Sequence, residues 1–130
     1  EQRKINPWKW QDQYGFSQGI EVTNASRVLY CAGQASVDEN GKPVHAGDMR
    51  KQIEQAFRNL EAVLKASGFG LANVVRLNYY TTDVDAFLGA SDIVGSRLSA
   101  AASQPSGTLL GVTKLAFPGL MIEIEATAVK

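Results

Sequence analysis

Two glutamates near the carboxyl end are the residues whose type and spacing first suggest chemistry. Between residues 122 and 129, Glu123 and Glu125 alternate with apolar residues, which is the period of a β-strand. Such a strand places both carboxylates on one face, about 7 Å apart. A carboxylate in a cleft can act as a general base or position a water molecule. The alternative is a solvated strand face, or a salt bridge from Glu123 to Arg76.

The single cysteine and the single histidine are weaker candidates for functional residues than the glutamates. Cys31 is the only cysteine and lies in an apolar run, so we expect an inert core residue; the alternative is a modifiable thiol. His45 is the only histidine and falls among turn residues before a predicted helix. A single histidine without a second ligand at metal spacing predicts neither a metal site nor a Ser–His–acid triad. We expect no cofactor.

The longest predicted helix runs over residues 48–67. Apolar residues recur at spacings of three and four along it, which gives a single buried stripe. Asp48 is placed to cap the first turn, and Gly68 is placed to end the last one. A second helix is predicted over residues 84–101.

Strands are predicted on both sides of these helices. Residues 16–23 and 27–32 suggest an antiparallel hairpin, and the second of these runs is apolar on both faces, as in a strand buried on both sides. Residues 73–82 form the next strand. The segment from Gln104 to Ala126 predicts two more strands, joined by a turn at Pro118. The expected order is β-β-α-β-α-β-β.

Residues 1–15 form an amino-terminal arm with two tryptophans, Trp8 and Trp10. The arm is predicted to be irregular or a short strand, either docked on the body or a neighbour or left as an exposed tail. We expect one domain over residues 1–130.

Two helices can cover only one face of such a sheet. The other face would carry polar residues such as Arg76 and Glu123 beside apolar ones, a mixture suited to an interface. We therefore expect either contact with another copy of the chain or closure on the amino-terminal arm.

The composition of the chain argues against nucleic acid and membranes as binding partners. Lysine plus arginine balance aspartate plus glutamate at 13 each, so there is no overall field for nucleic acid or an anionic membrane. No apolar run reaches the length of about 20 residues needed to span a bilayer, and no signal-peptide pattern opens the chain. With a single cysteine, these features predict a cytoplasmic protein without nucleic-acid or membrane partners.

Several stretches together resemble the Rid family (YjgF/YER057c/UK114, L-PSP endoribonuclease-like). The resemblance covers residues 14–130 in order and implies a chorismate-mutase-like α+β fold with a mixed sheet and two helices on one face. It also implies a homotrimer whose clefts between subunits bind small carboxylates. The matching stretches are residues 16–19, 31–34, 48–68, 74–83, 85–87, Pro105 and residues 122–126.

In the best-known branch of that family, reactive 2-imino or 2-enamino acids are hydrolysed to 2-oxo acids and ammonia. The resemblance implies that Glu123 positions the attacking water and that the backbone at Gly33 binds ligand. Phe16 stands where an aromatic, often tyrosine, lines the pocket. Glu123 is therefore the candidate catalytic residue, and Glu125 is expected to be structural.

The sequence departs from the family at the arginine that clamps the substrate carboxylate. Counting from Pro105 places this arginine at Gly107, and counting back from Glu123 places it at Thr108. These two residues either offer an N–H and a hydroxyl to a different polar ligand or mark a lost site. The chain resembles a branch without the arginine, and deaminase activity of the 2-iminopropanoate type is doubtful. Other cations that could replace the arginine, unless they are surface groups, are Arg76, Arg97 and Lys114.

Three functions follow. The first is a hydrolase that binds a small enamine or imine metabolite, with Glu123 catalytic and Phe16, Gly33, Gly107 and Thr108 binding substrate. The second is a non-catalytic trimer that binds a metabolite or partner. Ribonuclease activity or translation inhibition comes third, because the chain has no basic stripe and no paired histidines.

Overall fold

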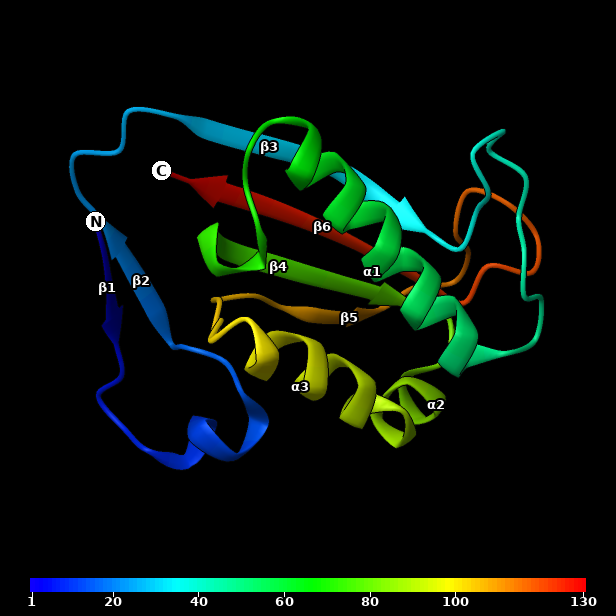
Figure 1. Ribbon diagram of the computed structural model, residues 1–130. Helices are drawn as coiled ribbons and strands as arrows, with labels where there is room; N and C mark the ends of the chain where they lie inside the picture. The colour runs from blue at the N-terminus through cyan, green and yellow to red at the C-terminus, as the bar shows by residue number, and fades with distance from the viewer.

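The computed structural model describes residues 1–130 and contains a four-stranded mixed sheet. The strand order is β3-β6-β4-β5, with β4 and β5 parallel and the other neighbours antiparallel (Figure 1). The predicted α+β class with a mixed sheet is confirmed. The strands are β3 (Val28–Ala35), β4 (Val74–Thr81), β5 (Leu109–Gly111) and β6 (Ile122–Val129).

Helix α1 (Met49–Ala66) confirms the first helix prediction and covers one face of the sheet. The Asp48 side chain caps it by accepting a hydrogen bond from the Lys51 N–H at 3.0 Å. Gly68 follows the helix with φ +78°, a left-handed conformation that favours glycine, and this turn lets the Phe69 N–H reach the Leu64 carbonyl. The buried stripe of α1 packs on β3 and β6, and its residues Ile53, Phe57, Leu60 and Leu64 share one core cluster with Leu77, Ile122 and Ile124.

The predicted helix over residues 84–101 is wrong as a continuous element. It divides into α2 (Val84–Gly89) and α3 (Ser91–Ala100) at Ala90. Gly89 has a low helix propensity, and the Ser91 hydroxyl donates to the Leu88 carbonyl at 2.8 Å, satisfying a carbonyl at the break. Both helices lie on the same side of the sheet as α1 (Figure 1).

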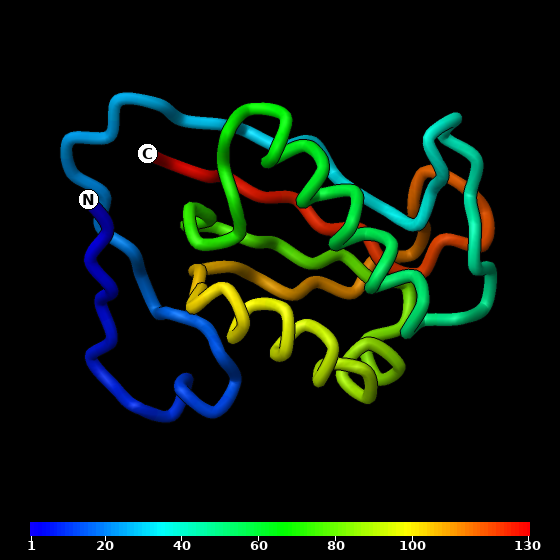
Figure 2. The backbone as a smooth tube through the Cα atoms, viewed as in Figure 1, coloured from blue at the N-terminus to red at the C-terminus, as the bar shows by residue number.

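The predicted hairpin of residues 16–23 and 27–32 is also wrong. Strand β2 (Gly19–Val22) pairs instead with β1 (Gln2–Ile5) in a separate two-stranded sheet, so the amino-terminal arm contributes a short strand. The connecting segment is held elsewhere, because the N–H groups of Ser26 and Arg27 both donate to the Lys130 carbonyl. This contact places β3 beside β6, and Figure 2 shows β1 and β2 set off from the main sheet.

The prediction that β3 is buried on both faces is wrong, because only one face of this strand is buried within the chain. Cys31 faces the core, where burial raises the pKa of its thiol, whereas Tyr30 is 79% exposed. The reason is that all helices lie on one side of the sheet. None of the helices combines the length and the apolar character that a membrane span requires.

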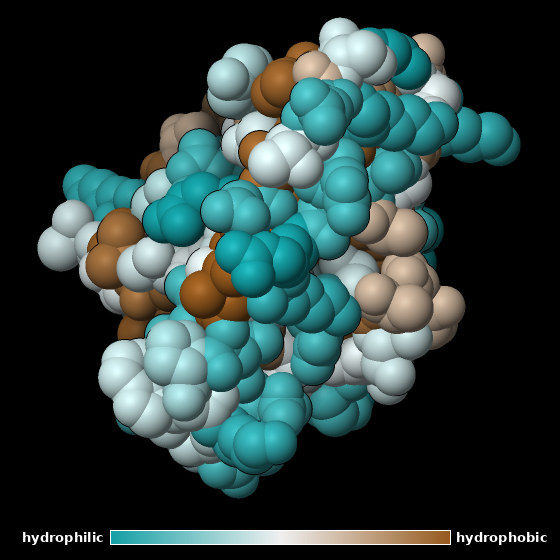
Figure 3. Space-filling model, turned by 90° about the vertical axis from the view of Figure 1, so that its left-hand side faces the viewer, coloured by the Kyte–Doolittle hydropathy of each residue, from teal (hydrophilic) through white to brown (hydrophobic).

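The rest of the arm forms a short 3-10 helix, η1 (Trp10–Tyr14), whose aromatic side chains are mostly exposed. Two hydrogen bonds from Ser17 connect this segment to the residues that follow α3. The Ser17 hydroxyl donates to the Gln104 carbonyl at 2.5 Å, and the Ser17 N–H donates to the Pro105 carbonyl. Figure 3 shows the end of the molecule where the arm lies, a mainly hydrophilic surface with small hydrophobic patches.

Candidate functional site

The face of the sheet away from the helices carries a polar row from β4 and β6. Burial along β6 alternates as predicted: Ile122 and Ile124 are buried under α1, while Glu123 and Glu125 are half-buried on the opposite face. Pairing with β4 sets Tyr80 opposite Glu123 and Asn78 opposite Glu125. The face therefore brings the two carboxylates beside hydrogen-bond donors of β4.

Glu125 is held by these donors. Its Oε1 accepts a hydrogen bond from Asn78 Nδ2 at 3.1 Å and another from the Tyr80 hydroxyl. The bond from Tyr80, then that from Asn78, lowers the pKa of the Glu125 carboxyl, and Arg76 adds a smaller effect in the same direction. The same contact with Glu125 raises the pKa of the Tyr80 phenol. These bonds agree with the structural role expected of Glu125.

Glu123 lies against Gly33. A Cβ built on Gly33 would come within 2.8 Å of Glu123 Cδ and 3.0 Å of its Cγ, so only glycine leaves room for this carboxylate. Strand β3 is irregular here, with a register shift between Cys31 and Gln34 that turns the Gly33 backbone toward Glu123. The structure thus brings together two predicted site residues that are 90 positions apart in the sequence.

The suggested salt bridge between Glu123 and Arg76 is not formed. Glu123 takes no part in the chain's three ion pairs. Arg76 Nη2 instead donates to Thr108 Oγ1 at 3.3 Å. The Glu123 carboxylate therefore stays available to a ligand or water.

Gly107 and Thr108 run alongside β4 just before β5. The Thr108 carbonyl accepts from the Tyr79 N–H at 2.8 Å, and the Thr108 N–H donates to Asn78 Oδ1 at 3.1 Å. A Cβ built on Gly107 would lie 2.9 Å from the carbonyl carbon of Leu77, which is backbone and cannot move aside cheaply. No arginine side chain fits at Gly107 without moving residues 107–108 away from β4.

The three candidate cations differ in what they contact. Arg97 donates to Glu61 at 2.6 Å and lies over the Phe57 ring, so it stabilises helix packing. Lys114 lines a smaller hollow formed by Thr82 and residues 113–120. Only Arg76 contacts a predicted site residue, Thr108, and it does so from β4.

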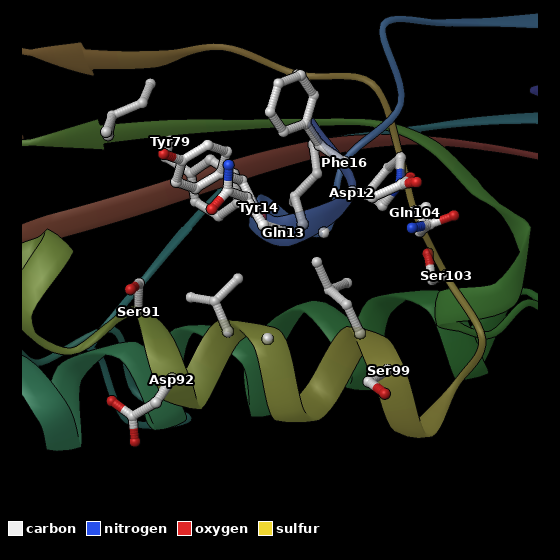
Figure 4. A pocket seen from close by; sticks show the side chains of 18 of the residues that line it. Asp12, Gln13, Tyr14, Phe16, Tyr79, Ser91, Asp92, Ser99, Ser103 and Gln104 are labelled. Carbon is white, nitrogen blue, oxygen red and sulfur yellow. The ribbon is translucent and has the colours of Figure 1, made fainter. Parts of the chain in front are cut away.

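Phe16, Gly107 and Thr108 line one cavity of about 1020 Å³ between the arm and α3 (Figure 4). The Trp10 ring packs edge-on against Phe16 with ring centroids 5.8 Å apart. Gly33 and Glu123 do not line this cavity. Within one chain the predicted site residues therefore form two groups: Gly33 with Glu123, and Phe16 with Gly107 and Thr108.

Sequence reasoning missed the residues that shape this cavity. Tyr79 faces it, and burial raises the pKa of its phenol. On α3, the small residues Ser91, Gly95 and Ser99 line the opposite wall. Their spacing of four residues places them on one face of a helix, which the sequence could have indicated. The spacing does not indicate which segment lies opposite that face.

Comparisons with known proteins agree with this fold. A family model described as endoribonuclease L-PSP matches residues 11–130. A RutC family protein from Pyrococcus horikoshii is 30% identical over 88% of this chain and 86% of its own length. A mouse protein named 2-iminobutanoate/2-iminopropanoate deaminase is 30% identical over 88% of this chain and 81% of its own. The crystal structure of YyfB from Yersinia pestis, described as a Rid family protein of unknown function, gives a TM-score of 0.88 at 34% identity, covering 99% of this chain and 98% of YyfB.

Proposed function

Because the chain belongs to the endoribonuclease L-PSP family, which includes Rid proteins, we propose that it binds and hydrolyses a small enamine or imine. The observation that carries this proposal is the Glu123 carboxylate, free of ion pairs and seated over the Gly33 backbone. The deaminase name of the mouse relative supports the choice of a C–N bond.

We propose a homotrimer in which the two groups of site residues meet across subunits. Glu123 and Gly33 of one subunit would face Phe16, Gly107 and Thr108 of the next. The exposed Tyr30 and the half-buried polar row of the open face support an interface there, because such a mixed face suits contact between copies of a chain.

In the proposed reaction, Glu123 accepts a proton from water as the water oxygen attacks the imine carbon. Glu123 returns this proton to the nitrogen. The hydroxyl group of the resulting carbinolamine then gives its proton to the nitrogen as the C–N bond breaks, so that ammonia leaves and the carbon becomes a carbonyl. One water is consumed for each imine, and no oxidant or cofactor is needed. An enamine first gains a proton at carbon and becomes the imine.

Gly107 sets the expected specificity. The clamp for a substrate carboxylate is missing, and the Leu77 backbone leaves no room for a side chain at this position. Arg76 beside Thr108 is the remaining cation that could contact a polar substrate group. We expect turnover of 2-iminopropanoate to be weak and turnover of imines that do not depend on a carboxylate clamp to be faster.

A coupled assay tests this function. Ammonia release is followed with freshly generated 2-aminoacrylate and with a panel of bulkier enamines and imines. The proposal predicts release above the uncatalysed rate for at least one bulky member of the panel. Release at the background rate for every compound would exclude hydrolysis.

The Leu77 backbone leaves no room at Gly107 for the arginine that clamps the substrate carboxylate. This observation favours a second candidate, a non-catalytic metabolite-binding protein. In that case a compound would raise the melting temperature with increasing concentration, without ammonia release. Measurable turnover would exclude this candidate.

Ribonuclease activity is not part of our proposal, because the chain carries 13 basic and 13 acidic residues. Intact RNA after incubation with nuclease-free protein is the expected result.

A further inference from the structure

The cavity between the arm and α3 has more room than a small imino acid needs. Its volume of about 1020 Å³ lies at the upper end of ordinary ligand pockets, which run from about 300 to 1,000 Å³. The room arises on α3, where Ser91, Gly95 and Ser99 present no large side chain. A Cβ built on Gly95 meets no atom within 4 Å.

Ser103 closes one end of this cavity without offering it a free hydroxyl. Ser103 is 6% exposed and lines the cavity, but its Oγ is shielded by surrounding atoms and makes no hydrogen bond within the chain. The shape, charge and rings of the cavity therefore decide what it can bind.

The charges around the cavity do not favour an anion. Asp92 points away from it and is paired with Arg50 through both carboxylate oxygens, at 3.0 and 2.8 Å (Figure 4). Lys4 is the only cation in the lining, and its Nζ donates to Gln104 at 3.0 Å. Asp12 contributes a negative charge nearby.

Aromatic rings from elements other than α3 also line the cavity. They are those of Tyr14, Phe16, Tyr79 and Phe87, and Tyr79 packs on Phe87 with ring centroids 5.3 Å apart. Rings in this arrangement favour a flat apolar group, which can add edge-to-face or offset contacts.

We propose that this cavity binds the aromatic part of an uncharged ligand. The inference rests on the proposed function, because Phe16, Gly107 and Thr108 line the cavity and were assigned to the substrate cleft. It extends that function by naming the substrate class: a bulky aromatic imine or enamine without a carboxylate requirement.

Binding of 2-naphthol to the full-length ¹⁵N-labelled protein tests the proposal by NMR titration. The amide signals of Ser91, Gly95, Ser99 and Ser103 should shift together and saturate. The anion 2-naphthoate should bind more weakly than 2-naphthol. Shifts confined to other residues, or tighter binding of the anion, would overturn the proposal.

Two glycine variants locate the site. Gly95→Leu fills the cavity from α3 and should weaken 2-naphthol binding by about tenfold, the effect of losing 1.4 kcal/mol. Gly89→Leu makes the same change at a residue outside the lining that also has no atom within 4 Å of a built Cβ, and should leave binding within about twofold. Equal effects of the two variants would contradict the proposal.

The two proposals fail separately, because 2-naphthol binding needs no turnover. If 2-naphthol does not bind while imine hydrolysis is measurable, this inference alone is refuted. If 2-naphthol binds and no imine is hydrolysed, only the proposed function is refuted.

Discussion

Gly33 and Glu123 depend on each other for their geometry. The carboxylate occupies the place where a Cβ of residue 33 would stand, and the atoms that would have to move belong to a flexible side chain. A substitution here should therefore disturb the site more than the fold.

Gly33→Ala tests this dependence. We expect turnover or ligand binding to fall by about tenfold or more because Glu123 must swing away, with a loss of unfolding free energy of about 1 kcal/mol or less. Chemical denaturation and the ammonia-release assay measure the two effects. Gly70→Ala is the control, since a Cβ there meets no atom within 4 Å. Full activity in Gly33→Ala would separate Gly33 from the site.

The lowered pKa of the Glu125 carboxyl predicts how its contribution to stability depends on pH. Bonds from Tyr80 and Asn78 lower its carboxyl pKa below the ordinary value of 4.5, so the ionised form is stabilised by folding. This contribution is present above the unfolded pKa and is lost as pH falls through the folded pKa. In Tyr80→Phe the Glu125 pKa should rise toward its ordinary value, as measured by NMR titration of the side-chain carboxyl carbon. An unchanged pKa would mean that Tyr80 does not hold the carboxylate.

At the scale of elements, Gln52 of α1 links the helix to the segment that leads into β6. Its Nε2 donates to the carbonyls of His45 and Gly119 at 3.1 and 2.8 Å, and its Oε1 accepts from the Met121 N–H at 2.8 Å. The Thr81 hydroxyl also donates to Met121 at 2.7 Å. Residue 121 is thus fixed two positions before Glu123.

Gln52→Leu should lower the free energy of unfolding by about 3 kcal/mol, because buried backbone groups lose their partners. Urea denaturation measures this loss. Gln55→Leu on the same helix is the control: Gln55 is only half-buried and bonds to side chains of its own helix, so the effect should be smaller. Equal losses would show that the buried link has no special role.

Periodicity and capping were enough to predict α1 and β6. Their apolar spacings are long and regular, and Asp48 and Gly68 mark the helix ends. The pairing of β2 could not be predicted in this way, because its partner β1 lies in the amino-terminal arm and the Lys130 carbonyl fixes the start of β3. Local pattern does not contain such distant contacts.

The candidate site was predictable only in part. The resemblance supplied Glu123 and Gly33, which the structure places in contact. The cavity needed three distant segments, the arm, β5 and α3, to be placed together. The closure at Gly107 likewise depends on the Leu77 carbonyl of a neighbouring strand.

At the scale of the whole molecule, the exposed face of the sheet is expected to meet other copies of the chain. Light scattering should give a mass near three times 14.0 kDa. Tyr30→Asp introduces a charge at a residue that is 79% exposed within one chain, and should shift the mass toward one subunit without unfolding it. Val84→Asp, at an exposed residue of α2 on the helix side, is the control. A wild-type mass near one subunit would remove the proposed cleft.

The most direct measurement compares ammonia release by wild-type protein, Glu123→Gln and Glu39→Gln, using the most rapidly hydrolysed compound of the imine panel. Glu123→Gln keeps the size of the side chain but cannot accept the proton, so its rate should fall by about 10²-fold or more. Glu39→Gln changes an exposed loop residue and should keep the wild-type rate. Wild-type activity in Glu123→Gln would contradict the account.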